Sequence, residues 1–208
     1  MKIFLQAAGA LIQKTKRMKS ISFSLFFFAL VGFDKAPPAR TTACLSSEEK
    51  KLYDIIMEYR KENKLEPIPL SENLSYVAQT HAHDLMENYK FDVSNVCNPH
   101  SWSAKGKWSA CCYTSDHKQS ACMWAKPKEL TGYPGNGYEI LYYSTAGATA
   151  QEGLDGWKVS PAHNPLIINS GIWANAKWKA IGIGIYGTYG MVWFGDEPDP
   201  AAPSLCKP

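Results

Sequence analysis

One short segment near the C-terminus restricts how this chain can fold. Isoleucine alternates with glycine through residues 181–185, which predicts a strand that packs bulky side chains on one face. The other face carries only Gly182 and Gly184, so it lets another backbone approach closely. Turn residues at 186–190 and an apolar stretch at 191–194 predict a returning partner strand. We therefore expect an antiparallel hairpin in the core.

Helices are predicted between the N-terminal region and this hairpin. The first begins at a capping-box sequence and extends over about residues 46–64, with apolar residues at helical spacing. Ser71 is placed to cap a second helix, whose apolar stripe runs through residues 74–85. A third helix is expected over residues 146–157, although two glycines weaken its pattern. The chain thus combines helices with an antiparallel sheet.

Three ionisable residues lie within or beside apolar segments. His81 falls on the stripe of the second helix, and we interpret it as a hydrogen-bonded core residue. His83 falls off the stripe and is interpreted as solvent-exposed, and neither histidine is assigned to a site. Glu139 is the single acid in the apolar segment 138–143, where an unpaired carboxylate is costly to bury. Either backbone amides and tyrosines satisfy it, or it has a functional role.

Residues 1–40 are interpreted as a signal peptide and short leader. Basic residues precede an uncharged, mostly apolar run at 21–33, which is too short to span a bilayer. Translation starts at either Met1 or Met18, and Met18 gives the more compact signal. This pattern predicts a secreted or cell-envelope protein, located extracellularly or in the periplasm, without a transmembrane anchor.

The charge distribution argues against nucleic-acid binding. The 208-residue chain has a formal net charge of +3, but residues 1–40 hold seven of the 22 basic residues and one of the 19 acidic residues. The remainder is therefore acidic, with a net charge of −3. No basic surface for nucleic acid is expected there. The Gly182-x-Gly184 pair lacks the third glycine and the following helix of a dinucleotide-binding fingerprint.

An even number of cysteines agrees with export to an oxidising compartment. The disulfide candidates are Cys44, Cys97, Cys111, Cys112, Cys122 and Cys206. Cys44 has two alternatives. The residues before it are similar to a bacterial lipobox, which would place a lipid anchor on its sulfur, but the aliphatic position is occupied by Thr41. We favour a disulfide between Cys44 and Cys206.

The other four cysteines lie in one polar segment. Adjacent Cys111 and Cys112 are poorly placed to bond each other. Cys97 therefore pairs with one of them and Cys122 with the other, and both pairings remain open. A zinc site that includes His100 and His117 is the rival interpretation. The absence of a Cys-x-x-Cys sequence favours disulfides.

A proline break places a histidine at the junction of two elements. Ser160 and Pro161 end one element and begin the next, because proline restricts the preceding residue and suits the first turn of a helix. His163 follows directly and precedes an apolar run. We therefore expect His163 to be presented at the junction rather than on a helix face.

The order of these motifs resembles the CAP superfamily, which includes cysteine-rich secretory proteins, antigen 5, pathogenesis-related proteins and bacterial SCP-domain proteins. The motifs are the Leu-x-x-x-Ala-x-x-His-Ala sequence at 74–82, His100-Ser101, Glu139, the Trp-x-x-Ser-Pro-x-His sequence at 157–163, and Ile-Gly-Ile-Gly with a terminal Trp-Phe-Gly. The resemblance covers about residues 46–195 and looks like the bacterial branch. Residues 196–208 form a proline-rich tail outside it.

The resemblance implies an α+β fold, a three-layer α-β-α sandwich with a central, mainly antiparallel sheet. It also implies a shallow cavity where two histidines and two acids converge. His100, Glu139 and His163 match three of these positions, whereas Ser160 stands where many relatives have the second acid. Two imidazoles and a carboxylate form a suitable ligand set for a divalent metal such as zinc.

Three functional interpretations follow, of which we favour a secreted binding or interaction module. Its partner would be a lipid, an envelope component or another protein, as the resemblance implies. The first alternative is a metal-assisted hydrolase, such as a peptidase, that uses the same cavity. No general base is identified for it, and Ser101, Ser103 and Ser160 are only positional candidates for a nucleophile. In the second alternative, the histidines and the glutamate are purely structural.

Overall fold

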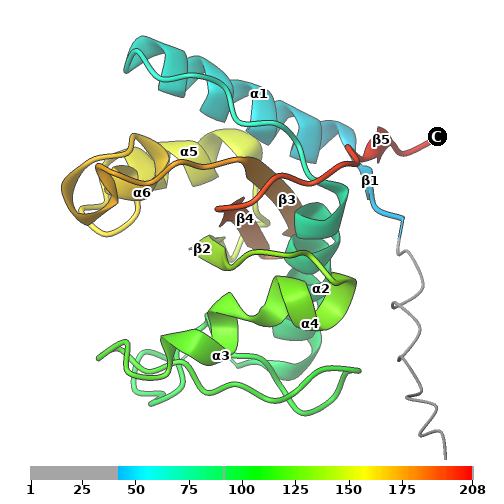
Figure 1. Ribbon diagram of the computed structural model, residues 1–208. Helices are drawn as coiled ribbons and strands as arrows, with labels where there is room; N and C mark the ends of the chain where they lie inside the picture. Colours follow the sequence, from blue (N-terminus) through cyan, green and yellow to red (C-terminus); the bar gives the residue numbers. More distant parts are fainter. Residues whose placement is uncertain (1–41, 91, 208) are drawn as a thin grey trace, which may run out of the picture. The chain divides into compact units, whose positions relative to one another are not determined.

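The computed structural model describes residues 42–90 and 92–207, so the predicted signal peptide and leader at 1–40 lie outside the described residues. Figure 1 shows the arrangement of the elements. In chain order they are β1 (Cys44–Leu45), α1 (Ser47–Glu62), α2 (Glu72–Asn88), α3 (Ser120–Trp124), α4 (Lys126–Thr131), β2 (Gly137–Tyr143), α5 (Ala150–Lys158), α6 (Asn164–Ile167), the 3-10 turn η1 (Gly171–Trp173), β3 (Ala180–Tyr186), β4 (Tyr189–Gly195) and β5 (Ser204–Leu205).

The central sheet has three antiparallel strands in the order β2-β4-β3. The predicted hairpin is confirmed: β3 and β4 pair from Tyr186 opposite Tyr189 to Ala180 opposite Gly195. Every residue of β4 is buried, because this strand lies in the middle of the sheet and both of its faces are covered. A second, two-stranded sheet joins β1 to β5 in parallel.

Helices cover both faces of the sheet, which gives the predicted α+β sandwich (Figure 1). The isoleucines of β3 pack with apolar residues of α1 and α5. The glycine face of β3 lies against α2, as the alternating sequence predicts. A Cβ atom on Gly182 would lie 2.1 Å from the carbonyl carbon of Leu74, and one on Gly184 would lie 2.3 Å from that of Ala78. The absence of side chains therefore lets a helix backbone rest directly on the strand.

The two ends of the described chain are joined. Cys44 forms a disulfide with Cys206, so the sulfur atom that a lipid anchor on Cys44 would require is bonded within the protein. The C-terminal segment also caps α2, because the carboxylate of Asp199 accepts hydrogen bonds from Ser71 Oγ at 2.6 Å and from the backbone N–H of Asn73 at 2.9 Å. The predicted proline-rich tail is thus fixed to the folded unit by the disulfide, by Asp199 and by the pairing of β5 with β1.

The third helix begins later than the sequence pattern predicts. Gly147 has a φ of +102°, which a right-handed helix excludes, and Thr149 is the N-cap of α5. The Thr149 side chain accepts a hydrogen bond from the backbone N–H of Glu152 at 3.3 Å. The helix therefore begins at Ala150 instead of residue 146. Within residues 42–90 and 92–207, no helix is long and apolar enough to cross a membrane.

Candidate functional site

A cavity with a volume of about 810 Å³ lies beside strand β2. Its walls come from the loop around residues 100–117, from α3, from β2 and from residues 161–173. The polar lining includes His100, Glu139 and His163, and the apolar lining includes Trp124, Tyr138 and Trp173. The three residues expected to converge therefore line one cavity. Ser160 does not line the cavity, but its hydroxyl group contacts His163, which does.

Glu139 lies in β2 opposite Trp193 of β4, so its side chain is on the face of the sheet that α2 covers. The side chain is fully buried and receives two hydrogen bonds from histidines rather than from backbone amides or tyrosines. Burial opposes ionisation of this carboxyl group, but the charge of His81 and the hydrogen bonds from both imidazoles outweigh it. Together they lower the pKa of Glu139 to about 2, so it is a carboxylate at neutral pH.

His81 is the first of these partners, and it binds Glu139 from α2. Its Nδ1 lies 2.6 Å from Glu139 Oε2, and its Nε2 lies 2.9 Å from the backbone oxygen of Ser101. Both neighbours are hydrogen-bond acceptors, so both ring nitrogens carry a proton and the imidazole is positively charged. The ring also stacks on Trp102 with a centroid separation of 4.2 Å. His81 is buried as predicted, but it also belongs to the Glu139 cluster, which the sequence interpretation missed.

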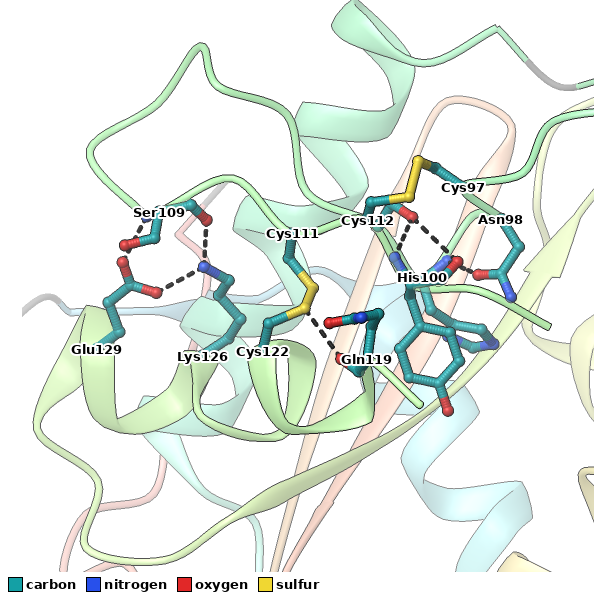
Figure 2. Close-up of a disulfide and its surroundings, with 12 residues drawn as sticks. Cys97, Asn98, His100, Ser109, Cys111, Cys112, Gln119, Cys122, Lys126 and Glu129 are labelled. Atoms are coloured by element: carbon teal, nitrogen blue, oxygen red, sulfur yellow. Dashed lines mark hydrogen bonds and ion pairs between the residues drawn. A yellow bond between two sulfur atoms is a disulfide. The ribbon is translucent and has the colours of Figure 1, made fainter. Parts of the chain in front are cut away.

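His100 is the second partner, and a loop closed by two disulfides presents it. Its Nδ1 donates to Glu139 Oε1 at 2.7 Å, and its backbone N–H donates to Asn98 Oδ1 at 3.0 Å. The disulfides are Cys97–Cys112 and Cys111–Cys122, which settles the open choice of pairing and removes these sulfurs from any zinc site. Figure 2 shows both bridges together with His100 and Asn98. The same loop contributes His117 to the cavity wall, where it binds the Tyr113 hydroxyl.

His163 occupies the junction between α5 and α6, as the Ser-Pro break predicts, and it is the N-cap residue of α6. Its Nδ1 lies 2.9 Å from Ser160 Oγ. Burial and the nearby imidazole of His100 lower the pKa of His163 to about 4, so this ring is neutral at neutral pH. Ser160 thus contacts this imidazole through its hydroxyl group.

The other candidate nucleophiles are engaged elsewhere. Ser101 Oγ accepts a hydrogen bond from the backbone N–H of Tyr113 at 2.8 Å. Ser103 bonds the carboxylate of Asp84 through both its backbone N–H and its hydroxyl. Neither serine contacts a cavity histidine through its side chain. Ser160 alone of the three has a hydroxyl bonded to an imidazole.

The expected metal ligands do not fit a three-ligand centre. Both oxygens of Glu139 already accept short hydrogen bonds from His81 and His100, so a metal ion would compete with these two imidazoles for the carboxylate. Among the described residues, no group of three or more histidines, cysteines and acids is arranged to hold a metal ion. The Nε2 atoms of His100 and His163 make no hydrogen bond to any described residue, so these two imidazoles keep a nitrogen available to a ligand.

The three-layer arrangement, the covered hairpin and the histidine-lined cavity define the class of fold to which the chain belongs: it has the fold of the SCP domain. An extracellular protein from Bacillus anthracis that contains an SCP domain superposes with a TM-score of 0.51 at 16% identity. That match covers 72% of this chain but only 40% of the other, so the chain spans less than half of that protein. The fold that the resemblance implies is thereby confirmed.

Two further solved structures are similar over the same share of the chain. An outer surface protein from Borrelia burgdorferi matches 72% of this chain and 92% of its own length, at 20% identity and a TM-score of 0.49. A cysteine-rich secretory protein from Staphylococcus aureus matches 72% of this chain and 38% of its own length, at 15% identity and a TM-score of 0.46. No protein-family model and no curated protein matches the sequence.

His163→Phe is expected to reduce the acid sensitivity of the fold. The folded pKa of His163 lies near 4, below its ordinary value of 6.5, so the unfolded chain binds the proton first. Stability contributed by His163 is therefore lost as the pH falls from about 6.5 to about 4, by an amount on the order of 1–2 kcal/mol for this partly exposed ring. Urea unfolding of both proteins across this window measures the effect. Equal slopes of stability against pH would show that the ring is not held neutral by the fold.

Proposed function

We propose that this chain is a secreted or envelope-associated binding module whose cavity takes a small, largely apolar ligand. The observation that carries the proposal is the composition of the cavity, with aromatic and aliphatic walls around one small polar end. At that end the carboxylate is already occupied by two histidines, so it is poorly placed to act as a general base. Three disulfides and the predicted signal peptide support a location outside the cytoplasm.

A metal-assisted hydrolase is the second candidate, favoured by one specific observation. His100 and His163 each leave Nε2 without a partner among the described residues, and two imidazoles can hold a zinc ion that activates water. The occupied carboxylate of Glu139 argues against this candidate, since it supplies neither a third ligand nor a free base. The arrangement therefore favours binding over hydrolysis.

The two candidates are separated by one comparison of variants. Native mass spectrometry of protein purified from its own source is expected to show a retained small molecule that a His100→Ala, His163→Ala double variant retains less well. Zinc calorimetry and a screen of peptide substrates are run on the same proteins. His83→Ala is the matched control, because His83 is exposed and stacks on Tyr186 away from the cavity. Zinc-dependent peptide turnover that the double variant loses and the control keeps would favour the hydrolase instead.

A further inference from the structure

The main chain of Glu139, rather than its carboxylate, faces the cavity. The side chain is fully buried, yet 6% of the residue's surface is exposed. That exposed surface therefore belongs to main-chain atoms. Glu139 lines the cavity together with its neighbours Tyr138 and Ile140. Neighbouring strand residues place their side chains on opposite faces of a sheet, so a cavity that touches all three residues lies along the edge of β2.

The pairing of the sheet aims the N–H and C=O groups of Glu139 away from β4. Alternate residues of an antiparallel strand point their main-chain groups towards opposite neighbours. On β3 the N–H of Ile183 points outward, where it donates to Ser75 Oγ at 3.3 Å. Its neighbour Gly182 therefore points inward and bonds Trp193 of β4. Because Trp193 points towards β3, it cannot bond Glu139, which lies opposite it on β2.

Leu141 gives the same result independently. Its carbonyl oxygen accepts a hydrogen bond from Trp157 Nε1 at 3.1 Å, so it also points away from β4. Glu139 is two residues earlier on the strand and shares this orientation. No described residue bonds the N–H or the C=O of Glu139. The cavity thus contains one free main-chain donor and one free main-chain acceptor, and neither depends on a protonation state.

Walls stand on both faces of this strand edge. Tyr113 and Met123 line the cavity from the face of the sheet that also holds the Glu139 side chain. Leu166 and Trp173 line it from the opposite face. The space between the walls admits one extended chain but not the edge of a second, helix-covered sheet. A volume of about 810 Å³ limits the occupant to a short segment.

We propose that the cavity binds a short, extended peptide segment, which pairs with the edge of β2 as an added strand. One peptide residue lies opposite Glu139, and its side chain lies on the face where His100 and His117 line the cavity. A hydroxyl or amide side chain suits this position, because it both donates and accepts hydrogen bonds whichever tautomers the imidazoles adopt. The side chains before and after it face the apolar wall at Leu166 and Trp173.

A peptide fits this cavity better than an acyl chain does. An acyl chain would cover the N–H and C=O of Glu139 without bonding them, which is unfavourable for both groups. A peptide main chain supplies the complementary acceptor and donor, and its apolar side chains gain affinity by burial. This inference rests on the proposed binding function and specifies its ligand class.

A panel of capped pentapeptides tests the inference. Each has the sequence acetyl-Ala-X-Z-X-Ala-amide, with valine, leucine or phenylalanine at both X positions and serine, threonine or asparagine at Z. The peptides are titrated into the full disulfide-bonded protein with a metal chelator present, in competition with the neutral apolar dye N-phenyl-1-naphthylamine. We expect the dye to bind and peptides of this pattern to displace it.

N-methylation of single amides in the tightest peptide separates main-chain pairing from side-chain contact. Alternate N–H groups of an added strand point towards β2 and away from it. Methylating an amide that points towards β2 is expected to weaken binding at least about tenfold, because it removes the donor to the Glu139 carbonyl. Methylating the alternate amides should change affinity by about twofold or less, so these peptides are the matched control. Tolerance at every amide, or equal loss at every amide, would overturn the inference.

Hydrogen exchange of the protein's own amides locates the bound peptide. The N–H of Glu139 is expected to exchange at least about tenfold more slowly in the complex, because it gains a hydrogen-bond acceptor. The N–H of Ile140 is the internal control, since it points into the sheet towards Val192 and should not change. Unchanged exchange at Glu139 with the peptide bound would contradict pairing with β2.

Two exposed apolar residues give matched variants. Ile172 lines the cavity and Val159 does not, and their exposed fractions are 90% and 83%. Ile172→Ser is expected to weaken peptide binding about threefold or more, and Val159→Ser to leave it unchanged. Equal affinity in the two variants, or dye that no peptide displaces, would overturn the inference and leave the binding module standing. Failure of both the dye and the peptides to bind would instead contradict the proposed function.

Discussion

Gly182→Ala is expected to lower the free energy of unfolding by about 3 kcal/mol or more, and Gly182→Val to prevent folding. The added Cβ would lie 2.1 Å from the carbonyl carbon of Leu74 and 2.3 Å from the backbone nitrogen of Ser75. These are main-chain atoms of α2, so no side-chain rotation relieves the overlap. Helix α2 would have to move away from β3, and it carries His81. Urea unfolding and the tryptophan spectrum measure both consequences.

Gly156→Ala is the matched control, because it adds the same methyl group where space exists. The nearest atoms to its Cβ are ring carbons of Tyr142 at 3.7 and 3.8 Å. Gly156 lies within α5, where alanine is favoured over glycine by up to about 1 kcal/mol. We expect equal or slightly higher stability. A loss at Gly182 no greater than the change at Gly156 would show that α2 is not held against the strand by close backbone packing.

Local features of the sequence predicted most of the fold. The capping box that begins α1 is present, with Ser46 and Glu49 bonding each other's backbone N–H groups at 3.2 and 2.7 Å. The alternating glycines of β3 predicted the close approach of another backbone. Such signals succeed because the interacting groups lie within a few residues of each other or on one face of a single element. The exact start of α5 was missed because Gly147 adopts a left-handed conformation that periodicity does not report.

The candidate site was only partly predictable, because its contacts join residues that are distant in sequence. The helical stripe predicted that His81 is buried, but its carboxylate partner Glu139 is 58 residues further along the chain. Nothing in either segment alone indicates that the two meet. The choice between two disulfide pairings was open for the same reason, since adjacent Cys111 and Cys112 are equivalent in spacing and only the folded loop distinguishes them.

Ser160 stands where the resemblance implies a second acid, so among the described residues Glu139 is the one acidic residue that lines the cavity. A second acid at this position would give the cavity a negative charge in addition to Glu139, which suits a metal cation. Glu139 is instead paired with His81, and Ser160 contacts His163 through a hydroxyl group.

Glu139→Gln is expected to lower the free energy of unfolding by about 3–5 kcal/mol at neutral pH, because it leaves the charge of His81 buried without a counter-ion. His81→Leu is expected to cost a similar amount by leaving the carboxylate with one partner. The double variant His81→Leu, Glu139→Leu removes both charges, so its loss should be smaller than the sum of the single losses by about 2 kcal/mol. Urea unfolding of the four proteins completes this cycle, and additive losses would contradict a buried ion pair.

The same cycle has a pH signature that separates charge from packing. The folded pKa of Glu139, about 2, lies below its ordinary value of 4.5, so the stability it contributes is present above about pH 4.5. That stability is lost as the pH falls from about 4.5 towards 2, because the unfolded chain then takes up the proton first. The wild type should therefore lose more stability across this window than Glu139→Gln, whose amide does not titrate. Parallel curves would mean that Glu139 stabilises the fold by filling space rather than by its charge.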